Sequence, residues 1–290
     1  MDDQRPDFLV IGAMKSATTT LHDQLARQPG LFMSHPKEPN FFSDDDVYAR
    51  GEDWYASLFA RAPQGTLRGE SSTHYTKLPT YPHTLARMAD ALPRVKLIYL
   101  MRDPIDRLIS QYRHQVNVGS VTVGIDEAID RHPELVDYGL YAHQLAPYIA
   151  EYGREAILPL SFHQLTEHSQ AVLDRIGAFL GTARPLTWDF SQKPRNVTSQ
   201  RLKKSPLRQM LVTLPILTPI RQALVPRSVT EPVKSLLRAN VGVPELAPET
   251  TERLREIYDA DLAQLGDWLG LPLTCDNFRE VTRERPMGWA

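Results

Sequence analysis

Residues 8–21 combine an apolar run with a cluster of hydroxyl and ammonium groups that could bind a phosphate. The apolar run is followed by Gly12, by Lys15 and then by five small or hydroxyl-bearing residues. These five are Ser16, Ala17, Thr18, Thr19 and Thr20. This order predicts a buried strand, a tight turn and a helix whose first N–H groups and positive dipole end face an anion. It differs from the Walker A motif, which has a glycine directly before its lysine, where this chain has Met14.

A second strand-to-helix junction places an arginine where parallel sheets bind ligands. Residues 95–101 form a continuous apolar run, typical of a strand buried on both faces, and lead directly into Arg102. Pro104 suits the first turn of a helix, which the sequence predicts over residues 105–118 and which carries Ser110. Arg102 is therefore expected at the carboxyl end of a strand, on the ligand-binding edge of the sheet.

Together the two elements resemble those of sulfotransferases that use 3′-phosphoadenosine 5′-phosphosulfate (PAPS). Residues 15–21 match the family's 5′-phosphosulfate loop, K-[ST]-G-T-T-x-L, with Ala17 in place of the usual glycine. Alanine fits there provided that the position does not need a positive φ. Arg102 and Ser110 match the 3′-phosphate element R-[DN]-P-x-x-R-x-x-S. The resemblance implies a P-loop-NTPase-like fold and transfer of a sulfuryl group from PAPS to an acceptor hydroxyl, with release of PAP.

Residues 37–42 resemble the K-E-x-x-[FY]-F segment of the glycan-type, or heparan-type, branch of this family, where the glutamate is the catalytic base. The resemblance makes Glu38 the expected base, and the alternative is that Glu38 only forms a surface ion pair with Lys37. His74 is the runner-up, because the cytosolic branch uses a histidine on a neighbouring strand. The likeness covers nearly the whole chain.

The same resemblance implies acceptor-side roles for Trp54, Glu70 and Tyr141. Two alternatives stay open: Glu70 could instead be structural and orient Lys15 or a loop, and Trp54 could belong to the core. Glu70 belongs to the segment 69–75, which also has a counterpart in these relatives. They often carry a lysine directly after this glutamate, where this chain has Ser71. Any role of that lysine in substrate binding is therefore in doubt for this chain.

The residue types divide the chemistry of sulfuryl transfer between them. Lys15 is placed to stabilise the bridging oxygen and the 5′-phosphate as the bond to sulfur breaks. The hydroxyls of Ser16, Thr18 and Thr19 would hold the phosphate with the helix N–H groups. A neutral hydroxyl is a poor nucleophile, so a base is needed, and Glu38 would supply it. No metal is expected, because the transferred group carries one negative charge and a lysine serves the leaving side.

Length and composition bound the class of protein. The 290 residues, 42% of them hydrophobic, suffice for one large domain over residues 1–290. Cys275 is the only cysteine, which excludes an internal disulfide framework. The net charge of −2 gives no global attraction for nucleic acid. No run approaches the roughly 20 apolar residues of a membrane span, and the acidic start is no secretory signal, so a cytoplasmic location is expected. The chain is rich in arginine and alanine and poor in lysine, which is typical of a bacterial source.

Apolar runs alternate with amphipathic stretches along the chain. Strands are predicted at residues 8–11, 31–33, 66–70, 95–101 and 156–160, and helices at 18–27, 54–59, 81–91, 105–118, 143–152, 169–180 and 250–269. This alternation predicts an α/β fold with a central parallel sheet and helices on both faces.

Residues 190–245 are predicted to form a helical, basic cap or lid within that domain. Arg195 and Arg201 are expected to close over the 3′-phosphate of the nucleotide. The apolar stretch at residues 207–225 leaves peripheral contact with lipid as an alternative, and it raises the chance of a hydrophobic acceptor.

The sequence leaves two other functions open. A P-loop kinase would need Mg²⁺, and a non-catalytic nucleotide-binding protein would lack the base. If the protein is a sulfotransferase, the acceptor could be a glycan, a glycolipid or a secondary metabolite with a free hydroxyl. The oligomeric state and the residue that stacks on adenine cannot be assigned.

Overall fold

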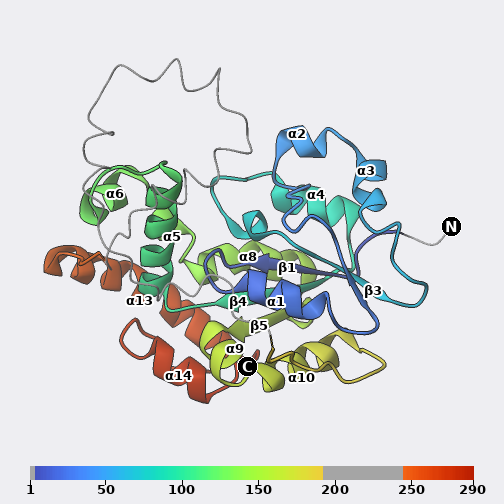
Figure 1. Ribbon diagram of the computed structural model, residues 1–290. Coiled ribbons are helices and arrows are strands. Elements are labelled where there is room, and N and C mark those ends of the chain that lie inside the picture. Colours follow the sequence, from blue (N-terminus) through green and yellow to red (C-terminus); the bar gives the residue numbers. More distant parts are fainter. Residues whose placement is uncertain (1–3, 192–243) are drawn as a thin grey trace.

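The structure, a computed structural model, describes residues 4–191 and 244–290 (Figure 1). Its centre is one five-stranded sheet in the order β2-β3-β1-β4-β5, in which every neighbouring pair is parallel. The strands are β1 (Phe8–Gly12), β2 (Leu31–Met33), β3 (Leu67–Ser71), β4 (Lys96–Met101) and β5 (Ile157–Ser161). The predicted α/β class and parallel sheet are confirmed.

Helices surround this sheet. They are α1 (Thr18–Leu25), α2 (Asp45–Tyr48), α3 (Glu52–Ser57), α4 (Thr84–Ala91), α5 (Pro104–Val118), α6 (Ile125–Arg131), α7 (Glu134–Asp137), α8 (Tyr141–Tyr152), α9 (Phe162–Glu167), α10 (Ser169–Leu180), α13 (Pro248–Leu269) and α14 (Phe278–Glu284), with 3₁₀ turns η1 (Thr73–Thr76) and η2 (Arg154–Ala156). All five predicted strands and all seven predicted helices are present, with ends shifted by at most a few residues. The short helices α2, α6, α7, α9 and α14 were not predicted.

The alternation of side chains along each strand divides the core into two layers. In β1, Leu9 and Ile11 pack with α4, α8 and α13 on one face of the sheet. Phe8 and Val10 pack with α1 and α10 on the other face. All four side chains are fully buried. The sheet is therefore covered by helices on both faces, as predicted, and its strands read as continuous apolar runs for that reason.

The strand order places one switch point at the middle of the sheet. The chain leaves β1 for β2 on one side, whereas it leaves β4 for β5 on the other side, and β1 and β4 are neighbours. Open parallel sheets bind ligands where the loops diverge in this way, at the carboxyl ends of the strands. The loop of residues 13–17 and the segment that begins at Arg102 flank this point.

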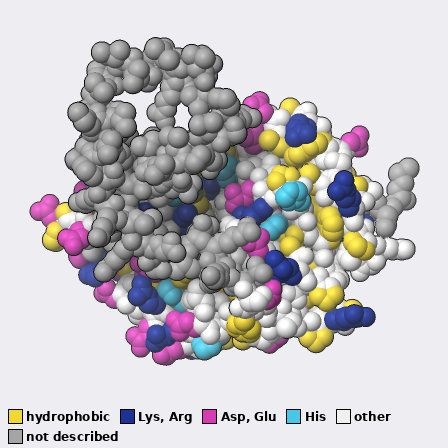
Figure 2. Space-filling model, viewed as in Figure 1, with side chains coloured by type: hydrophobic (Ala, Val, Ile, Leu, Met, Phe, Trp, Pro, Cys, Tyr) yellow, Lys and Arg dark blue, Asp and Glu magenta, His cyan; other side chains and the backbone are white. Residues whose placement is uncertain are grey.

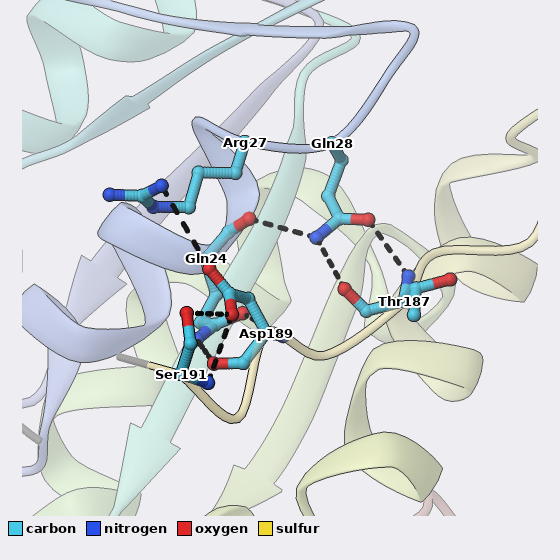
Figure 3. A network of polar contacts seen from close by, with 6 residues as sticks. All are labelled: Gln24, Arg27, Gln28, Thr187, Asp189 and Ser191. Atoms are coloured by element: carbon cyan, nitrogen blue, oxygen red, sulfur yellow. Dashed lines mark hydrogen bonds and ion pairs between the residues drawn. The ribbon is translucent and has the colours of Figure 1, made fainter. Parts of the chain in front are cut away.

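A polar network fastens residues 187–191 to the end of α1 and to the residues that follow it (Figure 3). The side-chain amide of Gln24 donates to the Asp189 carbonyl at 3.0 Å and accepts from its N–H at 2.9 Å. Gln28 pairs in the same two-way manner with Thr187, at 2.8 Å for both bonds. Both glutamines are buried. The last described residues before position 192 are thus held beside the helix that follows the 13–17 loop.

The described part of the chain contains no helix that is long and apolar enough to cross a membrane. The predicted cap, residues 190–245, lies almost entirely outside the described residues.

Candidate functional site

The loop after β1 is built from residues in the left-handed backbone region. Lys15 has φ 70° and Ala17 has φ 66°. The proviso made for Ala17 is therefore not met, because this position does need a positive φ. A non-glycine residue in this region costs about 1–2 kcal/mol. The fold holds that strain at the point where the chain turns from the strand into α1, as functional loops often do.

The N-terminus of α1 is open to a ligand. Among the described residues, no side chain caps the helix, whose N-cap is Ala17. Ser16 is fully buried, and its hydroxyl has no hydrogen-bond partner within the described part of the chain. Free N–H groups and an unused hydroxyl at the positive end of a helix form a site for an anion. The first turn also carries the predicted Thr18, Thr19 and Thr20.

Lys15 and Arg102 converge on this site from neighbouring strands. Burial lowers the pKa of Lys15, and the positive charge of Arg102 lowers it further, while Glu38 acts in the opposite direction. Two cations that raise each other's energy in a partly buried space are stabilised by an anion between or beside them. The arrangement fits a ligand with several phosphate charges.

The backbone of Arg102 is clamped by Tyr141. The tyrosine hydroxyl donates to the Arg102 carbonyl at 2.6 Å and accepts from its N–H at 3.2 Å. The guanidinium lies 4.8 Å from the ring centroid of Phe162 and 3.7 Å from the carboxylate of Asp106. Ser110 follows about two turns further along α5, where it is partly buried.

Glu38 lies in a loop that is fixed to the end of β3. Its N–H donates to the Ser71 carbonyl at 2.9 Å, and its φ is 58°. Its carboxylate is 2.5 Å from the ammonium of Lys37 and accepts a longer bond, 3.4 Å, from the hydroxyl of Thr73. Burial by itself raises the pKa of Glu38, but Lys37, with a smaller contribution from Lys77, brings it below its ordinary value. Glu38 is therefore ionised at neutral pH, as a base must be.

His74 lies close enough to Glu38 for each charge to affect the other. Its ring stacks on Tyr81 with the centroids 4.5 Å apart. Burial, and then the charge of Lys77, lower its pKa to about 4. The histidine is thus neutral at pH 7, and its Nδ1 atom has no partner among the described residues. The two candidate bases therefore lie near each other in the fold.

Two of the three expected acceptor-side residues are enclosed in the structure. Glu70 and Tyr141 are fully buried. Glu70 accepts bonds from the hydroxyls of Tyr55 and Ser72, and Tyr141 clamps Arg102 as described. Neither side chain has exposed surface, and the contacts of Glu70 favour the structural role that the sequence left open for it. Trp54 is partly buried and packs against the guanidinium of Arg50 at 3.9 Å, on α3 and its flank.

One further charged side chain in this region was not predicted. Lys77 follows η1 directly and is only 6% exposed. Its charge affects the pKa of Glu38, of His74 and of His114. The signal was present in the sequence, because Lys77 comes two residues after the segment 69–75 already singled out there.

The two arginines expected at the 3′-phosphate cannot be placed. Arg195 and Arg201 lie outside the described residues. In residues 4–191 and 244–290, no group of three or more His, Cys, Asp or Glu side chains could hold a metal ion.

Basic, acidic and histidine side chains gather near the middle of one face of the molecule, at the border of the undescribed segment (Figure 2). Fold and site together define a class of protein, an α/β protein with a candidate phosphate site at the edge of its sheet and a carboxylate beside that site. Residues 5–266 match the model of the sulfotransferase domain family. The chain belongs to this family.

Similar proteins agree with this assignment. Mouse heparan sulfate glucosamine 3-O-sulfotransferase 3A1 is 30% identical over 193 residues, which cover 63% of this chain and 48% of that protein. This chain spans about half, or less, of the length of the curated relatives it matches.

Solved structures share the fold. A sulfotransferase from Alicyclobacillus acidocaldarius superposes with a TM-score of 0.67 at 24% identity, covering 93% of this chain and 97% of that chain. Mouse sulfotransferase SULT7A1 complexed with PAP superposes with a TM-score of 0.51 at 16% identity, covering 89% and 84%.

Proposed function

We propose that this protein transfers the sulfuryl group of PAPS to a hydroxyl of an acceptor and releases PAP. The observation that carries the proposal is the convergence of three features at one edge of the sheet. These are the uncapped N-terminus of α1, the cation pair Lys15 and Arg102, and the ionised carboxylate of Glu38. The mouse structural neighbour was solved with PAP, the product that such a reaction leaves, which supports the choice of nucleotide.

The 13–17 loop and the segment that begins at Arg102 would each bind a different phosphate of the nucleotide. The unpartnered hydroxyl of Ser16, the hydroxyls of Thr18 and Thr19 and the first N–H groups of α1 would hold the 5′-phosphate. Arg102 and Ser110 would hold the 3′-phosphate, with Arg195 and Arg201 as further candidates. PAPS supplies an activated sulfuryl group, whose leaving oxygen gains negative charge as the bond breaks. Lys15 would neutralise that charge.

Glu38 would accept the proton of the acceptor hydroxyl. Its lowered pKa keeps it ionised at neutral pH, and Lys37 and Thr73 fix the orientation of the carboxylate. A positioned base of this kind contributes about 10²–10⁴-fold to the rate. His74 remains the second candidate base, since it is neutral at pH 7 and its Nδ1 is free among the described residues.

The acceptor would be a small molecule or glycan with a free hydroxyl. The name of the mouse relative, a heparan sulfate glucosamine 3-O-sulfotransferase, favours a sugar hydroxyl. The wider proposal includes glycolipids and secondary metabolites.

The test is calorimetric binding of PAP, ADP and AMP in the presence of EDTA. PAP is expected to bind at least tenfold more tightly than the other two, a gap of about 1.4 kcal/mol. Replacing Arg102 by Met should remove this preference and leave AMP binding nearly unchanged, because only the 3′-phosphate contact is lost. Equal affinities in the wild type, or binding that requires Mg²⁺, would refute the assignment and favour a P-loop kinase. Tight PAP binding without any turnover would favour a non-catalytic nucleotide-binding protein.

A further inference from the structure

Lys77 is a buried lysine whose backbone is fixed on both sides. The hydroxyl of Thr76 donates to the Ile11 carbonyl at 2.8 Å, which ties the turn η1 to β1. The N–H and carbonyl of Leu78 pair with the side-chain amide of Gln144 at 2.8 and 2.9 Å. Gln144 is itself fully buried. The position of Lys77 is thus set by the fold rather than by its own charge.

The ammonium of Lys77 has no counterion in the described part of the chain. No hydrogen bond or ion pair joins it to residues 4–191 or 244–290, and within these residues the ammonium lies 5.5 Å from the ring centroid of Tyr138. By contrast, the neighbouring Lys37 is already paired with Glu38 at 2.5 Å. The site therefore holds one cation that is committed to the base and one that is not.

Lys77 lies beside the base. Thr73, which contacts the Glu38 carboxylate at 3.4 Å, is the first residue of η1, and Lys77 follows the last. At about 2 Å of rise per residue, a 3₁₀ turn of this length separates the two backbones by roughly 8 Å. A lysine side chain can span much of that distance. Glu38 is the strongest charge that acts on Lys77.

Burying an ammonium without a partner is costly, and the cost is removed when an anion binds to it. We propose that Lys77 binds a negatively charged group of the acceptor, such as a carboxylate, next to the hydroxyl that Glu38 deprotonates. This inference rests on the proposed function, because it assigns Lys77 to the acceptor side of the same site. It narrows the acceptors to molecules that carry an anionic group within a few ångströms of the reactive hydroxyl.

The charge of Lys77 also depends on pH. Burial lowers its pKa to about 8, Glu38 acts to raise it, and Arg107 and Lys37 lower it further. The other titratable groups that face it are Tyr138, His74 and His114. Burial raises the pKa of Tyr138, and the lowered pKa values of the two histidines leave both neutral at pH 7. Lys77 is therefore mostly protonated at pH 7 and mostly neutral at pH 9, so its hold on an anion should weaken between these values.

The experiment compares matched acceptors that differ only in charge. The first pair is methyl β-D-glucuronide and methyl β-D-glucoside, and the second is 3-hydroxybenzoate and 3-hydroxybenzamide. Binding to the PAP complex is measured by calorimetry at pH 7 and pH 9, for the wild type, Lys77→Met and Lys77→Arg. Comparison of the sugar pair with the aromatic pair shows whether Lys77 recognises the negative charge on a sugar or on an aromatic acceptor.

In the wild type at pH 7, we expect at least one anionic probe to bind at least tenfold more tightly than its neutral partner. Lys77→Met should abolish this preference. Lys77→Arg should keep it, and should keep it at pH 9, where the wild type loses most of it. PAP affinity and the melting temperature of each variant report on folding and on the donor site.

The absence of any preference for an anion, or a preference that persists in Lys77→Met, would overturn the inference. Such a result with PAP still preferred over AMP would leave the proposed function intact. Loss of the preference for PAP in the wild type would instead refute the proposed function itself.

Discussion

Replacing Ala17 by Gly should stabilise this protein. Ala17 is the N-cap of α1, with φ 66° and ψ 22°, a conformation that glycine adopts without strain. Glycine is also a better N-cap than alanine. The substitution therefore relieves a local cost without changing the path of the chain.

The magnitude follows from two opposing effects. Relief of the left-handed backbone is worth about 1–2 kcal/mol. Glycine gives the unfolded chain more freedom, which costs about 0.4–1 kcal/mol. The methyl group of Ala17 also packs partly against the core on the α1 side of the sheet, and its loss reduces the gain. The net stabilisation should be about 0.5 kcal/mol, or a rise in Tm of about 1–2 °C.

Urea unfolding of the wild type, Ala17→Gly and Ala26→Gly measures this effect. Ala26 is an exposed C-cap of the same helix with φ −63°, so the same chemical change there should destabilise by about 0.5–1 kcal/mol. The sign of the change should thus differ between two ends of one helix. A destabilisation of Ala17→Gly as large as that of Ala26→Gly would show that the left-handed backbone costs nothing here, and the reasoning would fail.

Two further predictions concern single titratable groups. Glu38→Gln should lower turnover by about 10²–10⁴-fold while PAP affinity stays unchanged. In the wild type the acid limb of the pH–rate profile should lie below pH 4.5, because the pKa of Glu38 is lowered from that value; retained turnover in Glu38→Gln would point to His74. His22, whose pKa burial lowers from 6.5 to about 4, stays neutral in the fold while the unfolded chain protonates. The free energy of unfolding should therefore fall as the pH drops from 6.5 to 4, by up to about 3 kcal/mol from this group. Denaturant titrations at several pH values should show a shallower fall in His22→Gln, and an equal fall would contradict the assignment.

The strands and long helices could be predicted because each leaves a periodic signal in the sequence. The short helices could not, since four to seven residues carry too little periodicity. Their signals are local caps instead. Asp44 accepts from the N–H groups of Asp46 and Val47 to begin α2, and Ser161 begins α9 in the same manner. The capping residues Asp44 and Ser161 would have predicted these two helices, although their apolar periodicity could not.

The candidate site could be predicted only where one motif carries the residue. Lys15, Arg102 and Glu38 each belong to a contiguous pattern, and the fold brings them close enough for their charges to interact. Burial has no such local signature. The sequence therefore could not decide between an acceptor-side and a structural role for Glu70, and it gave no sign that Tyr141 is enclosed. Lys77 was not predicted at all, although its charge acts on Glu38.

The buried position of Glu70 explains how the fold holds the loop that carries Glu38, the proposed base. Its carboxylate accepts a bond from the Ser72 hydroxyl at 2.5 Å, and the oxygen of that hydroxyl accepts the Asn40 N–H at 3.1 Å. Asn40 has φ 55° and lies two residues after Glu38, whose own backbone is also left-handed. Burial raises the pKa of Glu70, and none of the described cations pairs with it, so its interactions are the hydroxyl bonds themselves. The bonds from Glu70 through Ser72 to Asn40 thereby fix the loop that contains the two left-handed residues, Glu38 and Asn40. This loop would orient the carboxylate of Glu38 before an acceptor binds.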